Sequence, residues 1–398
     1  MLSLIVVLAA LLLLWFVLQD AFEVMLLPRR VYRRVRLARL FFRFTWAAWL
    51  RLSRLLPESE RRVRFLGVFG PLSMVVLFAF WALILVIGFG LIDWGLQGHR
   101  NAHSSLPEQI YLSGVTFFTL GYGDVVPHAA ITRGISVVEA GMGLGFIAVV
   151  IGYLPILYQV FARREAHVIQ LDARAGSPPS AVTMLSLHAG RDSLGKLDVL
   201  LREWEVWAAE LLESHLSYPM LVYYRSQRDN QSWLSALAAV MDTCALILVG
   251  VEDLPPLQAR MTFTMTRQVI VEVARALTVN PSRYSGDDRL PHEHYLEMER
   301  RFAEVGLVWN GGSDAEETLH ALRGTYEPLL DGLSTRLVLP LPPWLAPEGS
   351  ADHWQTGHRG LIASRLVTQL AGHGGLGVTV ETGRGGIAQR LRSRLRRR

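Results

Sequence analysis

Cysteine, lysine and charged residues in general are scarce in this sequence. Cys244 is the only cysteine among 398 residues, which excludes an internal disulfide and a metal site built from several thiolates. Lys196 is the only lysine among 40 basic residues, and charged residues make up 19% of the chain against 51% hydrophobic residues. A mean hydropathy of +0.27 argues against an ordinary soluble protein, so a membrane must contribute to its stability.

The few charges are distributed unevenly along the chain. Residues 1–165 contain 16 arginines and 9 acids, whereas the last fifteen residues contain 7 arginines and no acid. The residues between them carry an excess of acids. The glycine-, histidine- and arginine-rich segment 346–398 is predicted to be a disordered basic tail. Its final arginines either contact anionic membrane lipid or stay solvated.

Three apolar stretches are long enough to cross a bilayer as helices, namely residues 1–18, 65–92 and 134–162. A cleaved signal peptide is the alternative for 1–18, but no basic segment precedes the stretch and no small-x-small cleavage site follows it. The sequence therefore predicts an all-α membrane protein with three transmembrane helices. Glu139 is the one acid in the third stretch; we expect it near the outer interface, with Arg133 as the alternative partner.

The connector 29–64 contains 12 arginines and two acids. Cytoplasmic loops are enriched in positive residues, so we expect this connector inside the cell, the N-terminus outside and the residues after Arg163 in the cytoplasm. The membrane would be the plasma (inner) membrane. Arg36–Leu56 has a basic and an aromatic face, which predicts a helix lying in the inner interface. Voltage sensing is the alternative, because arginines recur at Arg30, Arg33, Arg36 and Arg39, but no acidic partner lies on the preceding span.

The loop between the second and third spans contains Thr119-Leu120-Gly121-Tyr122-Gly123-Asp124. This string resembles the selectivity filter of potassium channels, in which a related TVGYG sequence binds the ion through backbone carbonyls. The resemblance covers roughly residues 66–160. It implies an ion-binding filter at Thr119, Leu120, Gly121, Tyr122 and Gly123, with potassium held by the carbonyls of the first four.

The flanking residues agree with this assignment. A strand that turns successive carbonyls to one side alternates ordinary and left-handed backbone angles, which glycine adopts at least cost, as at Gly121 and Gly123. Ser105-Leu106-Pro107-Glu108 has the spacing of a helix capping box with proline in the first turn. The predicted helix from there to about Phe118 is roughly 18 Å long, which is enough to enter a bilayer but not to cross it. Residues 66–163 therefore form the expected pore domain, with a re-entrant pore helix.

The match to potassium channels has departures and extensions. Leu120 replaces the usual valine and Phe118 replaces a frequent threonine. Tyr111 stands near the position of a tryptophan that bonds the filter aspartate, so a Tyr111–Asp124 hydrogen bond is expected to support the filter.

Two residues of the third span are candidates for gating. Gly143 stands where the family commonly keeps its gating-hinge glycine, and Pro155 can kink the same helix. Close helix packing is an equally good explanation for Gly143.

One filter occurs per chain, and a potassium pore needs four around one axis. The resemblance therefore implies a homotetramer with a closed ring of identical interfaces.

The cytoplasmic half is predicted to consist of a linker at 164–182 and a helical domain at 183–345. Its apolar periodicity predicts helices at Leu197–Leu216, Gln231–Val251, Leu257–Leu277, Glu293–Val305 and Ala315–Leu333. Asp242 makes the second of these a buried soluble helix rather than a span. A nucleotide-binding domain is not expected, because no strand, glycine loop and helix follow the third span. His292-Glu293-His294 suggests a metal site only weakly.

The sequence thus predicts a potassium-selective channel whose helical cytoplasmic domain modulates gating. The alternative is a pore-like membrane scaffold or receptor that does not conduct. No catalytic motif is present, so we expect no enzyme activity, no cofactor other than the transported potassium and no nucleic-acid partner. A ligand or protein partner for the cytoplasmic domain remains open, as does a role in assembly alone.

Overall fold

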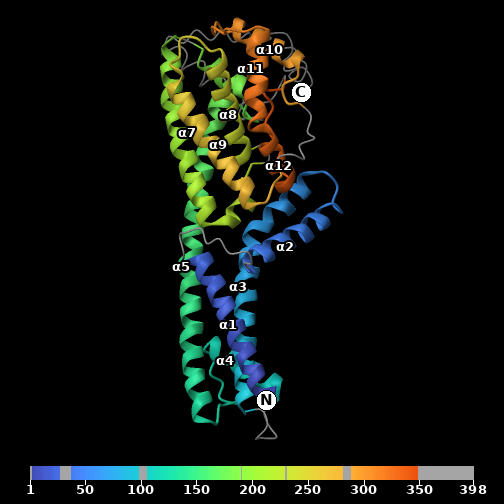
Figure 1. Ribbon diagram of the computed structural model, residues 1–398, viewed down its shortest axis with the longest axis vertical. Helices are drawn as coiled ribbons and strands as arrows, with labels where there is room; N and C mark the ends of the chain where they lie inside the picture. The colour runs from blue at the N-terminus through green and yellow to red at the C-terminus, as the bar shows by residue number, and fades with distance from the viewer. Residues whose placement is uncertain are drawn as a thin grey trace, which may run out of the picture. The chain divides into compact units, whose positions relative to one another are not determined.

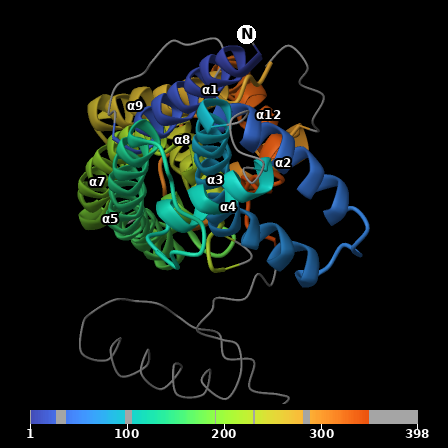
Figure 2. The ribbon, with the colours of Figure 1, turned by 90° about the horizontal axis from the view of Figure 1, so that it is seen from below.

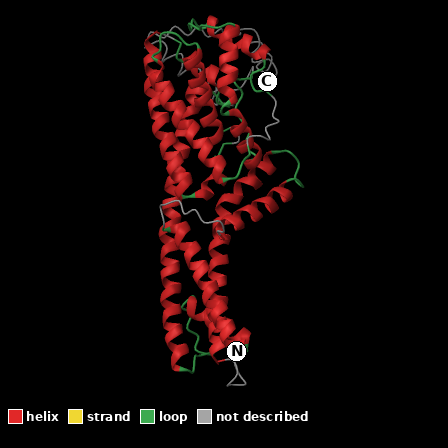
Figure 3. Ribbon diagram, in the orientation of Figure 1, coloured by secondary structure: helices red, strands yellow, loops and turns green. Residues whose placement is uncertain are grey.

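The structure is a computed structural model that describes residues 2–26, 37–97, 105–189, 191–228, 231–280 and 288–347. These residues form helices joined by loops, with one isolated bridge between Val251 and Trp309 (Figure 3). The first five helices are α1 (Leu2–Met25), α2 (Leu37–Ser53), α3 (Glu60–Gln97), α4 (Leu106–Phe117) and α5 (Ala130–Ala175). The all-α prediction is confirmed for the described part of the chain.

The remaining helices form the second half of the described chain (Figure 1). They are α6 (Ala181–Leu187), α7 (Arg191–Ser217), the 3-10 turn η1 (Pro219–Tyr223), α8 (Trp233–Val249), α9 (Pro256–Ala276), α10 (His292–Glu304), α11 (Ser313–Gly324) and α12 (Glu327–Leu337).

Three of the described helices are long and apolar enough to cross a membrane: Ser3–Met25, Glu60–Leu96 and Ala130–Ala175. They correspond to the three predicted spans, although the first extends past residue 18. At 1.5 Å per residue, the 46-residue α5 is about 69 Å long, more than twice the roughly 30 Å hydrocarbon core. A large part of α5 therefore lies outside the bilayer.

Helices α1 and α3 pack closely and antiparallel (Figure 2). A Cβ atom added to Gly88 would lie 2.6 Å from the Leu14 side chain, and one added to Gly95 would lie 2.6 Å from Val7. Small residues permit this close approach, which is how membrane helices gain packing energy where lipid offers no hydrophobic drive. The N-terminal end of α1 consequently lies beside the C-terminal end of α3.

Helix α2 packs against other protein elements more than its sequence suggested. Phe42 and Trp46 are buried, and their rings lie 5.9 and 5.1 Å from the ring of Tyr223 in η1. Trp46 Nε1 also donates a hydrogen bond to the Arg336 carbonyl of α12 (3.0 Å). The expectation that the aromatic face turns to the bilayer interface is therefore wrong for these two residues. Of the proposed arginine stripe, only Arg39 lies inside the described residues.

The linker predicted at 164–182 is largely absent, because α5 continues to Ala175. Val168, Leu171 and Ala175 are buried where α5 packs against α6, α7 and α8. Their spacing of three and four residues is that of a helix face turned to a core, so the sequence itself favours a helix here over a linker. Only residues 176–180 connect α5 to α6.

The C-terminal helices, α6 to α12, pack around α8. All residues from Trp233 to Ile247 are buried, and α8 contacts α6, α9, α11 and α12. A helix that is apolar on all sides is stable in water only as the centre of a bundle. The prediction that this helix is buried is confirmed, whereas its location outside the membrane stays a prediction.

The predicted helix 315–333 is instead two helices, α11 and α12, which are separated near Thr325 and Tyr326. Tyr326 is wholly buried, and its hydroxyl donates a hydrogen bond to Asp242 on α8 (2.8 Å). The apolar periodicity continues through the break, so it did not reveal the turn. The predicted tail 346–398 lies outside the described residues from position 348 onward.

Asp242 is the centre of a buried charge network. Arg289 Nη1 and Nη2 donate to its two oxygens at 2.8 and 3.1 Å, and Arg289 also bonds Glu327 at 2.7 Å. Arg323 bonds Glu327 at 3.0 Å. The adjacent carboxylates raise the pKa of Arg289 against the opposing effect of burial, so this guanidinium stays charged.

Replacing Arg289 with alanine is expected to destabilise the C-terminal helices by about 3–5 kcal/mol, because Asp242 would be left as a buried carboxylate without its charged partner. Thermal unfolding of the detergent-solubilised full chain, followed by circular dichroism, measures this loss. Arg275→Ala removes an arginine that pairs with Glu272 at the surface and should cost less than about 1 kcal/mol. Equal losses in the two variants would contradict the assigned role of the network.

His215 on α7 makes stability depend on pH. Burial, with a smaller effect of Arg164, lowers its pKa to about 3, and its Nδ1 bonds the Leu211 carbonyl at 2.8 Å. In the unfolded chain His215 takes up a proton near pH 6.5, whereas in the folded chain it stays neutral at that pH. The free energy of unfolding therefore decreases as the pH falls below 6.5. Between pH 6 and 4.5 the free energy of unfolding of the unmodified chain should fall more steeply with pH than that of His215→Gln, by about 1.4 kcal/mol per pH unit. Denaturant unfolding at each pH measures this slope, and identical slopes would contradict the assignment.

Candidate pore and filter

The helix before the filter begins at a capping box, as predicted. The Ser105 hydroxyl accepts from the Glu108 backbone N–H (3.4 Å), and the Glu108 carboxylate accepts from the Ser105 backbone N–H (3.0 Å). Pro107 occupies the first turn, where a missing N–H costs no hydrogen bond. Helix α4 is 12 residues or about 18 Å long, so it can enter a bilayer only part of the way.

Two glycines hold α4 between α3 and α5 (Figure 2). A Cβ atom on Gly90 of α3 would lie 2.8 Å from the Ile110 backbone, and one on Gly143 of α5 would overlap the Phe117 carbonyl. No side chain could occupy either position without displacing the backbone of α4. Gly143 therefore has a packing role, and its role as a gating hinge stays a prediction, as does that of Pro155.

The backbone after α4 alternates in handedness. Thr119, Gly121 and Gly123 have φ angles of +56°, +63° and +76°, while Leu120 and Tyr122 do not have positive φ. This alternation turns successive carbonyl groups toward the same side of the strand, the arrangement expected for Gly121 and Gly123 from the sequence. Thr119 also adopts the left-handed conformation, although it is not a glycine. Its backbone N–H is bonded to the Thr116 carbonyl at 3.0 Å, which helps to fix the turn out of α4.

The expected hydrogen bond behind the filter is present in the structure. Tyr111 Oη on α4 donates to Asp124 Oδ2 at 2.8 Å. The bond joins the pore helix to the residue that follows Gly123, so it spans the outer end of the filter segment. Its contribution to filter rigidity stays a prediction.

Glu139 is packed among protein elements, and its expected depth near the outer interface stays a prediction. It is completely buried and accepts a short hydrogen bond from Ser113 Oγ, while Ser113 also contacts the Val86 carbonyl. Arg133 is not its partner, because Arg133 Nε donates to the Pro127 carbonyl at 3.1 Å. Glu139 therefore connects α5 to the back of the pore helix. Glu139 could be singled out from the sequence because it is the one acid in an apolar span. Its partner Ser113 could not be predicted from the sequence.

Helix α5 exposes many large apolar side chains within its candidate span, and only 17% of its most apolar window is buried. These exposed residues are Ile131, Val137, Val138, Leu144, Ile151, Leu154, Ile156, Tyr158 and Ile169. The side chains of Leu120 and Tyr122 in the filter segment are also exposed. This surface is large enough to require cover by lipid or by another protein chain.

Beyond the apolar residues of α5, Arg164 connects this helix to the C-terminal helices. Its guanidinium is buried and bonds the carbonyls of Leu221 (2.9 Å) and Tyr224 (2.7 Å), at and just after η1. It also makes two hydrogen bonds to Glu165 at 2.9 and 3.0 Å. We call this arrangement the Arg164 clamp. Sequence analysis did not find it, because the carbonyls come from residues almost sixty positions away.

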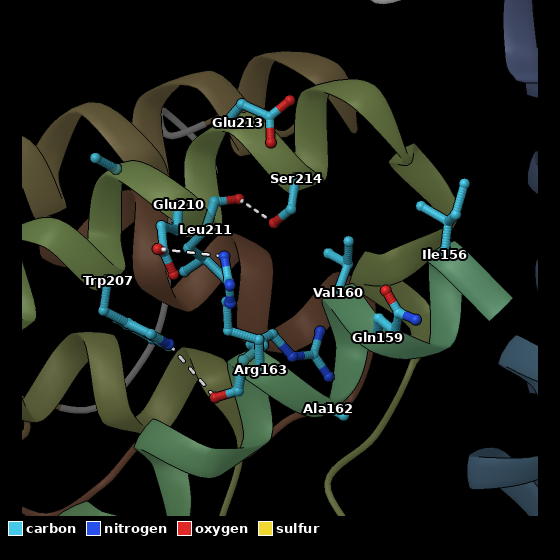
Figure 4. Close-up of a pocket in the computed structure, with 12 residues that line it drawn as sticks. Ile156, Gln159, Val160, Ala162, Arg163, Trp207, Glu210, Leu211, Glu213 and Ser214 are labelled. Atoms are coloured by element: carbon cyan, nitrogen blue, oxygen red, sulfur yellow. Dashed lines mark hydrogen bonds and ion pairs between the residues drawn. The ribbon is translucent and has the colours of Figure 1, made fainter. Parts of the chain in front are cut away.

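A cavity of about 750 Å³ lies next to the clamp, between α5 and α7 (Figure 4). Arg163 and Glu210 face each other across it at 3.7 Å, and Trp207 Nε1 contacts the Arg164 carbonyl at 3.4 Å. Arg163 is mostly exposed, unlike its neighbour Arg164.

No cluster suited to a metal ion occurs among the described residues. The sequence left His292-Glu293-His294 as a weak metal candidate, but His292 Nδ1 contacts Glu316 instead, at 2.9 Å. This contact lies on the exposed surface of the C-terminal helices.

Comparison with known proteins identifies the pore segment. Residues 72–159 match a family model described as an ion channel. The uncharacterized membrane protein YdjJ of Bacillus subtilis is 23% identical over 210 residues, which are 49% of this chain and 58% of YdjJ. The small conductance calcium-activated potassium channel protein of Drosophila melanogaster is 29% identical over 91 residues, 22% of this chain and 10% of its own length.

Protein LctB of Geobacillus stearothermophilus is 36% identical over 84 residues, 18% of this chain and 62% of LctB. The chain thus spans less than two thirds of the length of each of these relatives. No solved structure matches it. In this multi-pass membrane protein, residues 72–159 match the ion-channel family model and are similar, at low identity, to a potassium channel.

Proposed function

We propose that this chain is one subunit of a homotetrameric, potassium-selective channel that conducts passively across the plasma membrane. The observation that carries the proposal is the alternating backbone at Thr119, Gly121 and Gly123, which directly follows a helix too short to cross a bilayer. The match of residues 72–159 to ion channels supports it independently.

Backbone carbonyls suit potassium for a chemical reason. They replace the oxygens of the hydration shell without adding a fixed negative charge that would hold the ion too tightly to let it pass. The carbonyls of Thr119, Leu120, Gly121 and Tyr122 would supply these oxygens. The C-terminal end of α4 would turn its partial negative charge toward the inner mouth of the filter, where a cation waits.

Four copies are needed because a single strand cannot surround an ion. Each chain contributes one such filter, and the exposed apolar surface of α5 offers a face for neighbouring subunits. A ring of identical head-to-tail interfaces would close after four subunits. Conduction would then be a property of the assembly.

We further propose that the cytoplasmic helices modulate gating through α5, with the N-terminus outside the cell and these helices inside. The Arg164 clamp supports this mechanism, because it ties the helix that continues from the pore to η1. A rearrangement of the cytoplasmic helices would therefore act directly on α5.

Reconstitution of the purified full chain into liposomes with an outward potassium gradient tests the proposed function. We expect potassium efflux that barium blocks, with sodium efflux at least about tenfold slower, and a tetramer by native mass spectrometry. Equal potassium and sodium efflux would overturn the selectivity. Tetramers without flux in any tested lipid would favour the non-conducting scaffold instead.

A further inference from the structure

A second cavity, of about 300 Å³, lies where the membrane helices meet the cytoplasmic half. Its walls come from the end of α1, the start of α2, the η1 region and the ends of α9 and α12. Val24, Phe42, Met220 and Val273 are among the apolar side chains that line it. Its volume is at the lower end of the roughly 300–1,000 Å³ typical of small-molecule pockets. We call it the basic pocket, because of the charges described next.

Three arginines line the basic pocket: Arg39 and Arg43 of α2, and Arg336 of α12. No carboxylate pairs with any of them among the described residues. Arg39 and Arg43 lie one helical turn apart, and α2 contains no acid in its 17 residues, so their repulsion is not relieved within the helix. The buried Arg336 Nε has no hydrogen-bond partner. The three arginines therefore place positive charge without a paired carboxylate around the apolar wall of the basic pocket.

Three further lining residues are polar but do not supply a negative charge. His215 is buried and neutral, Tyr223 is a buried phenol, and Thr278 is exposed just after α9. An occupant must therefore bring its own anion for the arginines, together with an apolar part for Val24, Phe42 and Val273. A free inorganic anion meets only the first of these requirements.

We propose that the basic pocket binds an anionic phospholipid of the adjacent leaflet, with its phosphate on Arg39, Arg43 and Arg336 and the first part of an acyl chain among the apolar residues. The position favours a membrane lipid, because Val24 lies at the end of candidate span α1 and Leu40 and Phe44 expose apolar side chains on α2 beside the arginines. The pocket is too small for a whole phospholipid, so the rest of the lipid stays in the bilayer.

The bound lipid would act on the same structural element as the Arg164 clamp. Met220 and Tyr223 of η1 line the basic pocket, while the Leu221 carbonyl between them accepts from Arg164. Tyr153 of α5 also contacts Met220, with its hydroxyl 3.6 Å from the sulfur. A lipid that fixes η1 would thereby fix the position of α5. This regulatory consequence rests on the proposed channel function, whereas the binding step does not.

Binding is tested without any measurement of conduction. The detergent-solubilised full chain is titrated with a short-chain phosphatidylglycerol or the matched phosphatidylcholine, and bound lipid is counted by native mass spectrometry. We expect phosphatidylglycerol to bind at least about tenfold more tightly. The double variant R39A/R43A should lose about tenfold in phosphatidylglycerol affinity. R51A removes an arginine of the same helix that does not line the pocket, and it should change the affinity less than about twofold.

A second variant tests the apolar part of the pocket without changing its charge. A276W places a large ring at the exposed end of α9 and should also weaken lipid binding, with unfolding temperature as the check on folding. Equal binding of the two lipids, or equal losses in R51A and R39A/R43A, would overturn the proposal. Complete competition by 10-fold excess inorganic phosphate would assign the site to a free anion instead. If the protein binds phosphatidylglycerol but shows no potassium flux, the proposed channel function fails while the proposed lipid site stands.

Discussion

Replacing Gly121 with alanine should abolish potassium flux while leaving the protein folded. Gly121 has a φ of +63° and open space around its Cα, so the substitution causes backbone strain and no clash. A left-handed alanine costs about 1–2 kcal/mol, and the proposed ring contains four copies. Relief of this strain would rotate carbonyls away from the ion path. We expect flux into liposomes to fall at least about a hundredfold.

Gly134→Ala is the matched control for this experiment. Gly134 lies in helix α5, lacks a positive φ and also has nothing within 4 Å of an added Cβ atom. Alanine favours a helix by about 1 kcal/mol over glycine, so this variant should retain flux and stability. Undiminished flux in Gly121→Ala would remove Gly121 from the ion-binding strand. The circular dichroism spectrum and native mass of both variants establish that they fold and assemble.

Replacing Arg164 with alanine should release α5 from the C-terminal helices. The variant leaves Glu165 as a buried carboxylate and deprives the Leu221 and Tyr224 carbonyls of their donor. Breaking a buried pair of this kind costs about 3–5 kcal/mol. We expect a lower unfolding temperature and, in single-channel recordings, an open probability that changes at least about threefold. Selectivity for potassium over sodium should stay the same, because the filter is not touched.

Arg163→Ala provides a control one residue away. The Arg163 side chain is 72% exposed and lies 3.7 Å from Glu210, so its loss should cost less than about 1 kcal/mol. Arg164→Lys keeps the charge, but its ammonium has three N–H donors and cannot reproduce all four hydrogen bonds of the guanidinium, so it should fall between the other two variants. If open probability in Arg164→Ala equals that of Arg163→Ala, the clamp has no part in gating.

Helices were predictable wherever one local rule decided the outcome. The capping box fixed the start of α4, and uninterrupted apolar length identified the candidate spans. The prediction of a linker after Arg163 failed, because α5 continues to Ala175 and packs there against α6, α7 and α8, helices whose position the local sequence does not give. The break at Tyr326 also depended on a distant partner, Asp242. Such distant partners cannot be predicted from the local sequence.

For the candidate site, the sequence by itself determined the filter segment and its glycines, because left-handed backbone is a property of single residues. Tertiary structure alone decided what surrounds that segment. It brought Ser113 to Glu139, Phe117 to Gly143, and Arg164 to the carbonyls of η1. These contacts join residues from 26 to 60 positions apart, and their geometry depends on how whole helices pack. The backbone conformation that a residue prefers depends on that residue alone, whereas the distance between two helices depends on how the entire fold packs.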